Sequence, residues 1–334
     1  MQNNINNILS IDVEDWFHIL DSPAVPKIDT WGDLPLRAEA SMDKILTMLA
    51  ESGTKATFFW LGWQAERMPQ LVKRCQEQGH EIASHGYGHI LAYQAGHRAF
   101  AEDIRRAKAI LEDITGQAIR GFRAPGFGIT DKAAWAFDVI KSAGYEYDSS
   151  VFPSSRGHGG IADSPLGSYY IKTDSGMLPE VPMSMVDIMG RRLSLFGGGY
   201  LRLAPQRLIR WGIRQLHRRN EPLIVYVHPR EVDPQHPRLP LSLARRFKSY
   251  INLKSTMPKL QWLCKNYSFC TMHELIEDFV RAFYSETVNN IPVVDMTTGK
   301  AANKKVAMPK PLRPEIIEYN PDKKVKKEVK LEDH

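Results

Sequence analysis

Cysteine is scarce in this chain, and the few cysteines present form no recognisable pattern. Cys75, Cys264 and Cys270 are odd in number and include no C-x-x-C pair, which excludes a disulfide framework and a zinc ribbon. No run approaches the roughly 20 apolar residues that a membrane span needs. The first residues, MQNNINNILSIDVEDW, lack the basic and apolar regions of a secretory signal. We therefore expect a soluble protein of a reducing compartment, the cytoplasm.

Long blocks of one charge are also missing. The 334 residues carry 44 Lys and Arg against 38 Asp and Glu, and the basic residues do not form the unbroken tail of many nucleic-acid-binding proteins. We therefore predict that no nucleic acid is bound. What the chain does contain is a hydrophobic fraction of 43%, with 7 Trp and 13 Phe, which is enough to bury a sizeable core.

Short apolar runs alternate with amphipathic segments through most of the chain. Strands are predicted at residues 8–12, 55–62, 80–84, 121–125, 145–150 and 222–229. Helices are predicted at residues 41–53, 66–79, 98–115, 131–144, 205–219, 255–266 and 273–284. Ser41 would be the N-cap of the first helix, and Gly53 would end it. Strands and helices in turn, joined by short loops, predict an α/β fold with a parallel sheet or barrel inside a layer of helices.

Two stretches depart from this alternation. Residues 154–200 are rich in glycine and are predicted to be mostly loop. From residue 286 the chain is rich in Lys and Pro and shows neither a helical nor a strand period, so residues 286–334 are predicted to be a flexible tail. Residues 1–285 would then form one α/β domain, which the segment from about residue 230 extends.

Polar residues with catalytic chemistry cluster at the C-terminal ends of the predicted strands. They are Asp12, Glu14 and Asp15 after the first strand, His85 and His89 after the third, and Arg123, Asp148 and His228 at the ends of later ones. In α/β barrels the loops at this edge converge on one mouth, where the catalytic groups lie. We therefore expect these side chains to meet.

The stretch HGYGH, residues 85–89, contains two histidines four residues apart. Gly86 stands where a zinc protease of the H-E-x-x-H type has its general base, and the two glycines disfavour a regular helix, so that protease class is excluded. A glycine-containing loop can still aim both imidazoles at one point. A catalytic ion of the zinc type takes about three protein ligands and keeps one open position. The acids of IDVED, residues 11–15, can supply the third ligand.

Five motifs together resemble those of the polysaccharide deacetylase family, the NodB-homology carbohydrate esterases. They are SIDVED (10–15), HGYGH (85–89), RAP (123–125), YDSS (147–150) and IVYVHP (224–229). The family usually has T-F-D-D-G as its first motif and a hydroxyl residue in place of Gly86. The stretches DVEDWF, GGGY (197–200) and VHPRE (227–231) are similar to a subgroup associated with exopolysaccharide and exosortase gene clusters. The resemblance covers about residues 6–230 and implies an irregular (β/α) barrel of about seven parallel strands.

The resemblance also implies roles around a metal ion. Asp12 would be the general base that takes a proton from the attacking water. The carboxylate ligand beside His85 and His89 would be Glu14, because the two-residue period of a strand puts it on the same face as Asp12; Asp15 is the alternative ligand. The ion would be divalent, with zinc as the first choice, although imidazole and carboxylate ligands also suit iron, cobalt and manganese.

The resemblance implies an acid as well as a base. His228 would be the general acid that protonates the leaving amine. Asp148 would orient and charge that imidazole, and Arg123 would hold Asp12 in line. Each of these residues also has a purely structural interpretation, as a cap at the end of a strand or as a surface ion pair.

Side chains beside the motifs are candidates for binding the sugar. They are Trp16, Phe17, Tyr87, Pro125 and Phe127. Aromatic rings at such positions can stack on a glycan, but they are as often part of the core.

The predicted helix at 205–219 combines basic and apolar residues. Its arginines Arg207, Arg210, Arg214 and Arg218 fall on one face. A basic amphipathic helix can lie on anionic lipid, which would suit a lipid-linked glycan and would hold the protein at the inner face of the membrane. A solvated outer helix of the barrel is the alternative interpretation.

These patterns predict a metal-dependent hydrolase that removes N-acetyl groups from an amino sugar in an exopolysaccharide or its precursor. The alternative within enzymes is hydrolysis of another linear or cyclic amide, such as the ureide ring of an allantoinase-like reaction. Outside enzymes, the alternatives are a carbohydrate-binding barrel that retains the metal and a basic scaffold for polyanions. Asp12 and His228 argue against binding alone, because binding needs neither a base nor an acid.

Overall fold

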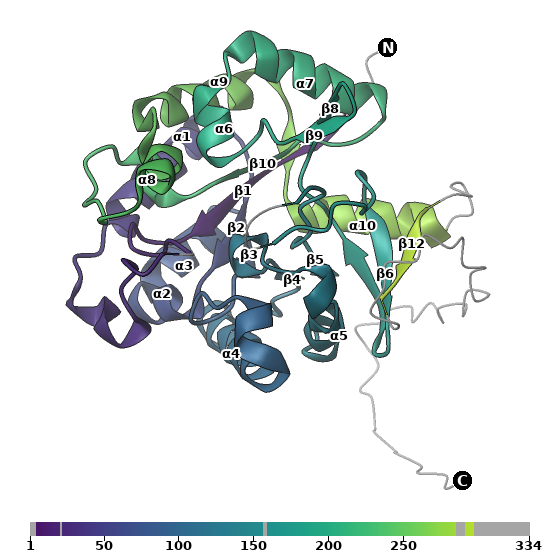
Figure 1. Cartoon of the computed structure of the whole chain (residues 1–334), viewed down its shortest axis with the longest axis horizontal. Coiled ribbons are helices and arrows are strands. Elements are labelled where there is room, and N and C mark those ends of the chain that lie inside the picture. Colours follow the sequence, from purple (N-terminus) through teal and green to yellow (C-terminus); the bar gives the residue numbers. More distant parts are fainter. Residues whose placement is uncertain (1–4, 21, 156–158, 285–290, 297–334) are drawn as a thin grey trace, which may run out of the picture.

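The computed structural model describes residues 5–20, 22–155, 159–284 and 291–296. A mostly parallel ten-stranded sheet forms its centre, and helices surround the sheet (Figure 1). The strands of this sheet are β1 (Asn7–Val13), β2 (Thr57–Trp60), β3 (Glu81–Ser84), β4 (Gly121–Phe122), β5 (Tyr147–Asp148), β6 (Tyr169–Thr173), β7 (Gly176–Glu180), β10 (Ile224–Val227), β11 (Phe269–Cys270) and β12 (Val293–Asp295). A separate two-stranded sheet pairs β8 (Val186–Ile188) with β9 (Arg191–Leu193).

The strand order is β10-β1-β2-β3-β4-β5-β7-β6-β12, and β11 also pairs with β1. From β10 to β7, seven successive strands run parallel, which confirms the α/β fold and the number of parallel strands expected from the sequence. Beyond them, β6 is antiparallel to β7. No strand pairing joins β10 to β12 among the described residues, so the sheet is open.

The register of the sheet aligns the C-terminal ends of its parallel strands. Val13 lies opposite Trp60, Trp60 opposite Ser84, Ser84 opposite Phe122, and Phe122 opposite Asp148. Each of these residues is at or next to the last position of its strand. The loops that follow the strands therefore start along one edge, as expected from the polar residues at the predicted strand ends.

Helices lie around this sheet (Figure 1). They are α1 (Ala38–Ser52), α2 (Gly62–Arg67), α3 (Pro69–Glu77), α4 (Ala92–Thr115), α5 (Trp135–Ser142), α6 (Gly198–Leu203), α7 (Gln206–Arg218), α8 (Leu243–Tyr250), α9 (Thr256–Asn266) and α10 (Met272–Tyr284). Gly53, with a φ of +62°, ends α1 as predicted. The helix begins at Ala38, however, and the predicted N-cap Ser41 lies inside it. The reason is that a distant carboxylate, Asp15, accepts hydrogen bonds from its first N–H groups.

Two stretches predicted to be irregular contain strands. Residues 154–200 are rich in loops, as predicted, but they also include the short strands β6 to β9 and the start of α6. These strands are only 3 to 5 residues long, too short for a period to be visible, and pairing with their neighbours stabilises them. In the predicted tail, β12 pairs with β6 and is not free. Apart from residues 291–296, residues 286–334 lie outside the described part of the chain.

Helix α7, the predicted basic amphipathic helix, buries its apolar face. Ile209, Ile213 and Leu216 are at most 1% exposed, and its arginines remain on the outside. The structure contradicts the interpretation of α7 as a lipid-facing helix, because the side chains that would enter the lipid belong to the core. Every helix in the described part of the chain is too short or too polar to traverse a bilayer.

Candidate active site

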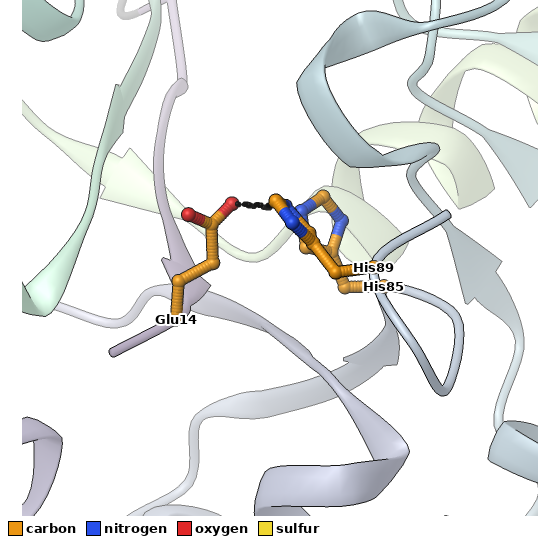
Figure 2. Close-up of side chains that lie close together, drawn as sticks. All are labelled: Glu14, His85 and His89. Carbon is orange, nitrogen blue, oxygen red and sulfur yellow. Dashed lines mark hydrogen bonds and ion pairs between the residues drawn. The ribbon is translucent and has the colours of Figure 1, made fainter. Parts of the chain in front are cut away.

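His85 and His89 lie on a loop after β3, as predicted for HGYGH. Gly86 and His89 have φ angles of +75° and +53°, and a Cβ on Gly86 would lie 2.7 Å from Oδ2 of Asp103. Asp103, from α4, accepts hydrogen bonds of 2.7 and 2.8 Å from the backbone N–H groups of the two residues that follow Gly86. Glycine is therefore required here both by the conformation and by the available space. The loop turns both imidazoles towards the end of β1 (Figure 2).

Glu14, directly after β1, is surrounded by imidazole rings. Its Oε1 lies 2.9 Å from Nε2 of His89, 3.3 Å from Nε2 of His85 and 3.5 Å from Nε2 of His228. Burial by itself would raise the pKa of Glu14, but the charges of His89 and His228 and hydrogen bonds from the rings hold it well below its usual value. The carboxylate is therefore ionised, as a metal ligand must be.

Glu14, His85 and His89 form a group that fits a divalent metal ion. Their ligand atoms all lie within 4.8 Å of one another, and all three residues are buried. Nδ1 of His85 donates to the carbonyl oxygen of Arg123 at 2.7 Å, which leaves Nε2 free to act as a ligand, and such a second partner is usual for metal-bound histidine. Burial lowers the pKa of His89, which favours the neutral ring. Two nitrogens and one oxygen suit zinc and its transition-metal neighbours.

Asp12 is held by Arg123, as the sequence predicts. The Arg123 side chain is 0% exposed, and its Nη1 donates to Oδ1 of Asp12 at 2.7 Å and to Oγ of Ser10 at 2.8 Å. Its other two nitrogens donate to the carbonyl and hydroxyl oxygens of Ser149. The guanidinium carbon lies 4.0 Å from the centre of the Phe59 ring. With its donors occupied, Arg123 fixes the carboxylate of Asp12 in one orientation.

His228 follows β10, and a carboxylate that the sequence analysis missed orients it. Nδ1 of His228 lies 2.8 Å from Oε1 of Glu231, because the short 3₁₀ turn Pro229–Val232 brings residue 231 back over the ring. Burial would raise the pKa of Glu231, but Arg202 at 3.4 Å and His228 lower it to about 2. Burial would lower the pKa of His228, yet the Glu14 and Glu231 carboxylates raise it. The three-residue spacing in VHPRE could have indicated this pair.

The prediction that Asp148 orients His228 is therefore wrong, because Glu231 occupies that position. Asp148, in β5, instead accepts a hydrogen bond from Oγ of Ser150 at 2.6 Å and pairs with Glu180 of β7. Both carboxyl groups are fully buried. Burial raises the pKa of Asp148 to about 6, and burial together with the charge of Asp148 raises that of Glu180 well above its usual value. The two acids therefore form a buried pair on neighbouring strands.

Asp15, the alternative ligand, is engaged elsewhere. One of its oxygens accepts from the backbone N–H of Arg37 and of Ala38, at 2.9 and 3.0 Å, and the other accepts from the N–H of Trp16 at 2.8 Å. These bonds cap the N-terminus of α1. The geometry therefore favours Glu14 over Asp15 as the ligand.

Two of the five residues predicted to bind sugar belong to the core. Trp16 is 6% exposed and Phe17 is 0% exposed, and both pack in a cluster with Trp31 and Trp63. Nε1 of Trp16 donates to the carbonyl oxygen of Pro35 at 3.0 Å. The interpretation of these rings as a stacking platform is wrong, because the loop and helices after β1 cover them.

The other three predicted sugar-binding residues have different surroundings. Tyr87 faces outwards, where its hydroxyl donates to Glu66 at 2.8 Å and its ring lies under the Arg106 guanidinium, so the prediction for Tyr87 is wrong. Pro125 is buried at the start of a 3₁₀ turn and is absent from the cavity lining in the described residues. Phe127 does line the cavity, with its ring 4.9 Å from that of Tyr226.

A cavity of about 480 Å³ connects the polar group to the surface. Its lining includes Asp12, Glu14, His89 and His228, together with residues of α6 and α8. A side chain that the sequence analysis missed, His18, also lines it.

His18 carries a buried donor without a partner next to this cavity. Its Nδ1 accepts from the backbone N–H of Asp15 at 2.9 Å, and burial lowers its pKa well below the usual value. The ring is therefore neutral and carries its hydrogen on Nε2, which has no hydrogen-bond partner in the described part of the chain. Its position four residues after Glu14, in DVEDWFH, was the available signal.

The site of this α/β protein therefore combines three features: a Glu–His–His group that could hold one metal ion, an aspartate held by an arginine, and a histidine held by a carboxylate. The model of the family Polysaccharide deacetylase matches residues 29–147. The model described as a domain of unknown function (DUF3473) matches residues 149–277. Residues 29–147 of the chain are thus similar to the polysaccharide deacetylase family.

Similar proteins agree with this family. The chain is 33% identical to a peptidoglycan-N-acetylglucosamine deacetylase of Bacillus cereus, over 31% of this chain and 46% of that protein. It is 35% identical to a chitooligosaccharide deacetylase of Sinorhizobium fredii, over 30% of this chain and 44% of that protein. The alignments thus span less than half of each relative.

A solved structure supports the fold. The crystal structure of a Mycobacterium smegmatis protein assigned to the polysaccharide deacetylases superimposes with a TM-score of 0.53 and 17% identity. The superposition covers 84% of this chain and 92% of that chain. At this identity the likeness concerns the fold alone.

Proposed function

We propose that this protein is a metal-dependent N-deacetylase that acts on an N-acetylated amino sugar in an exopolysaccharide or its precursor. The observation that carries the proposal is the pairing around the Glu14–His85–His89 group. A base candidate held by an arginine and an acid candidate held by a carboxylate line the same cavity as that group. Amide hydrolysis needs a base for water, an acid for the leaving amine and an electrophile for the carbonyl. The exopolysaccharide part of the proposal rests on the similarity of DVEDWF, GGGY and VHPRE to one subgroup.

Different contacts position the base candidate and the acid candidate. When bound, a divalent ion supplies Lewis acidity, which polarises an amide carbonyl and makes water more acidic. The Asp12 carboxylate, kept in place by Arg123, takes the proton of the attacking water. His228 holds a proton on Nδ1 against Glu231, and the same carboxylate stabilises the protonated ring that gives its Nε2 proton to the leaving amine.

His18 and Phe127 shape the cavity for the substrate. The Nε2–H of His18 is a donor without an acceptor among the described residues, and a buried donor of this kind favours a ligand that brings an acceptor oxygen. Phe127 and Tyr226 offer an apolar surface beside His228. An N-acetyl sugar has both features, an amide oxygen and an apolar ring face.

Acetate release tests the proposal. N-acetylglucosamine oligomers and native exopolysaccharide are incubated with the metal-loaded protein, with and without a chelator, and free acetate is measured. Asp12→Asn should lower the rate by about 100- to 10,000-fold, because it removes the general base. Asp113→Asn, a change of the same chemistry on the exposed side of α4, is the matched control and should leave the rate unchanged.

Two results would contradict the proposal in different ways. Acetate release that is indifferent to the chelator would exclude the metal mechanism. Bound metal without acetate from any glycan would favour hydrolysis of a ureide ring or glycan binding without catalysis. Release from oligomers but not from exopolysaccharide would keep the deacetylase and overturn the choice of polymer.

A further inference from the structure

Helices α6 and α8 expose large apolar side chains at the mouth of the cavity. Tyr200 and Leu203 on α6 are 53% and 49% exposed, and Leu243 and Phe247 on α8 are 84% and 56% exposed. These are four of the nine exposed large hydrophobic residues in the described part of the chain. We call these four residues the α6–α8 rim. Because Tyr200, Leu203 and Phe247 are exposed and also line the cavity, the rim lies at the open edge of the cavity.

Hydrogen bonds fix the two helices of the rim to each other. The buried guanidinium of Arg202, from α6, donates to the carbonyl oxygens of Lys248 and Ser249 at the end of α8, at 2.7 and 3.1 Å. Leu243 and Phe247 are four residues apart and therefore share one face of α8. The apolar side chains are held in solvent by a structured support, which is unusual unless they meet a partner.

The two segments of the sequence that carry the rim are basic. Residues 188–220 and 234–273 contain many Arg and Lys but no Asp or Glu, although the whole chain carries a net charge of only +6. Exposed Arg246 and Lys248 stand beside Phe247 on α8. A second copy of this chain would bring two such basic faces together and be repelled. A nucleic acid would pair with the cations but leave the four apolar side chains in water.

We propose that the α6–α8 rim docks on the surface of an anionic phospholipid membrane, with the cavity entrance turned towards the lipid. The interface of such a membrane accepts both kinds of side chain, because apolar groups enter the boundary between headgroups and acyl chains while cations stay at the phosphates. This assignment differs from the one made for α7, whose apolar face is buried. It does not depend on the deacetylation proposed above.

Sedimentation of the full chain with vesicles tests the docking. One set of vesicles is phosphatidylcholine alone, and the other is an equimolar mixture with phosphatidylglycerol. We expect binding to the anionic vesicles only, weakening as salt is raised. Leu243→Ser/Phe247→Ser should bind about 10- to 100-fold more weakly, because it removes the inserted apolar area. Arg246→Ser/Lys248→Ser should bind roughly 30-fold more weakly, at about fivefold per cation near the surface.

The control is Met189→Ser. Met189 is 98% exposed and stands near Arg191 and Arg192 in the sequence, so it is also an exposed apolar side chain close to cations, but it belongs to the β8–β9 turn and not to the rim. This variant should bind vesicles like the wild type. Equal binding to neutral and anionic vesicles, or equal binding by wild type and the Leu243/Phe247 variant, would overturn the proposal. So would a dimer, seen by sedimentation velocity without lipid, that the same variant abolishes, because the rim would then be a contact between copies.

Discussion

The two regions matched by family models contribute unlike parts to one site. The chain up to residue 147, including β1 ahead of the matched range, supplies Asp12 and the buried Glu14–His85–His89 group. Residues 149–277 supply His228 with its partner Glu231, and also the exposed helices α6 and α8. The first region has side chains that could hold an ion, and the second has the proposed proton donor and the exposed helices beside the cavity. Metal content and turnover should therefore be separable by mutation.

The largest effect is expected for Glu14→Ala in the first region. Removing the carboxylate of the metal group should lower metal affinity by more than about 100-fold, since losing a partner outside the ligand shell already costs about 10- to 100-fold. Metal content after dialysis, measured by mass spectrometry, checks this. Asp15→Ala is the control: it should keep the metal and lower the free energy of unfolding by about 1–2 kcal/mol, because α1 loses its cap. Equal metal retention in the two variants would refute the ligand assignment.

An intermediate effect is expected for Glu231→Gln in the second region. The variant should keep its metal, but kcat for acetate release should fall by about tenfold or more, because His228 loses the charge that stabilises its protonated form. Asp148→Asn, which removes the carboxylate that the sequence favoured for this role, should lower kcat less. A larger loss of kcat in Asp148→Asn than in Glu231→Gln would show that Asp148, and not Glu231, supports His228 as the acid.

The smallest effect is expected for Glu180→Gln, beneath the boundary of the two regions. Asp148 and Glu180 have raised pKa values when folded, so their contribution to stability is present at low pH and is lost as pH rises through about 6, the pKa of Asp148. The variant removes one of the two acids. Relative to wild type, its free energy of unfolding should therefore improve by about 1–3 kcal/mol between about pH 4 and pH 8. Urea denaturation at both pH values checks this, and a pH-independent difference would contradict it.

Sequence patterns predicted the first region better than the second. Polar residues that directly follow a strand share an edge once the strands are parallel, so Asp12, His85 and Arg123 could be brought together without a structure. The period of two along β1 favoured Glu14 over Asp15. The structure is consistent with this choice, since Glu14 lies beside His85 and His89 while the Asp15 oxygens cap α1. Glu231 was missed because its position depends on the 3₁₀ turn after Pro229.

The remaining errors concern what covers a side chain. An amphipathic pattern shows that α7 and α8 each have an apolar face. It does not show that the apolar face of α7 is buried in the core while that of α8 is exposed to solvent. Trp16 and Phe17 stand beside a catalytic motif in the sequence, yet Trp31 and Trp63 pack on them in space. Contacts between residues distant in the chain decide such cases, and no local period records them.

The way Arg202 holds α8 leaves the side chains of that helix free to change during evolution. The guanidinium lies against Glu231 on one side and holds the end of α8 on the other, but its contacts with α8 are to carbonyl oxygens of the backbone. Any amino acid offers that oxygen. The side chains of α8 can therefore be exchanged from one descendant to another while the helix keeps its place, so the entrance can adapt to new surroundings without disturbing the proton donor behind it.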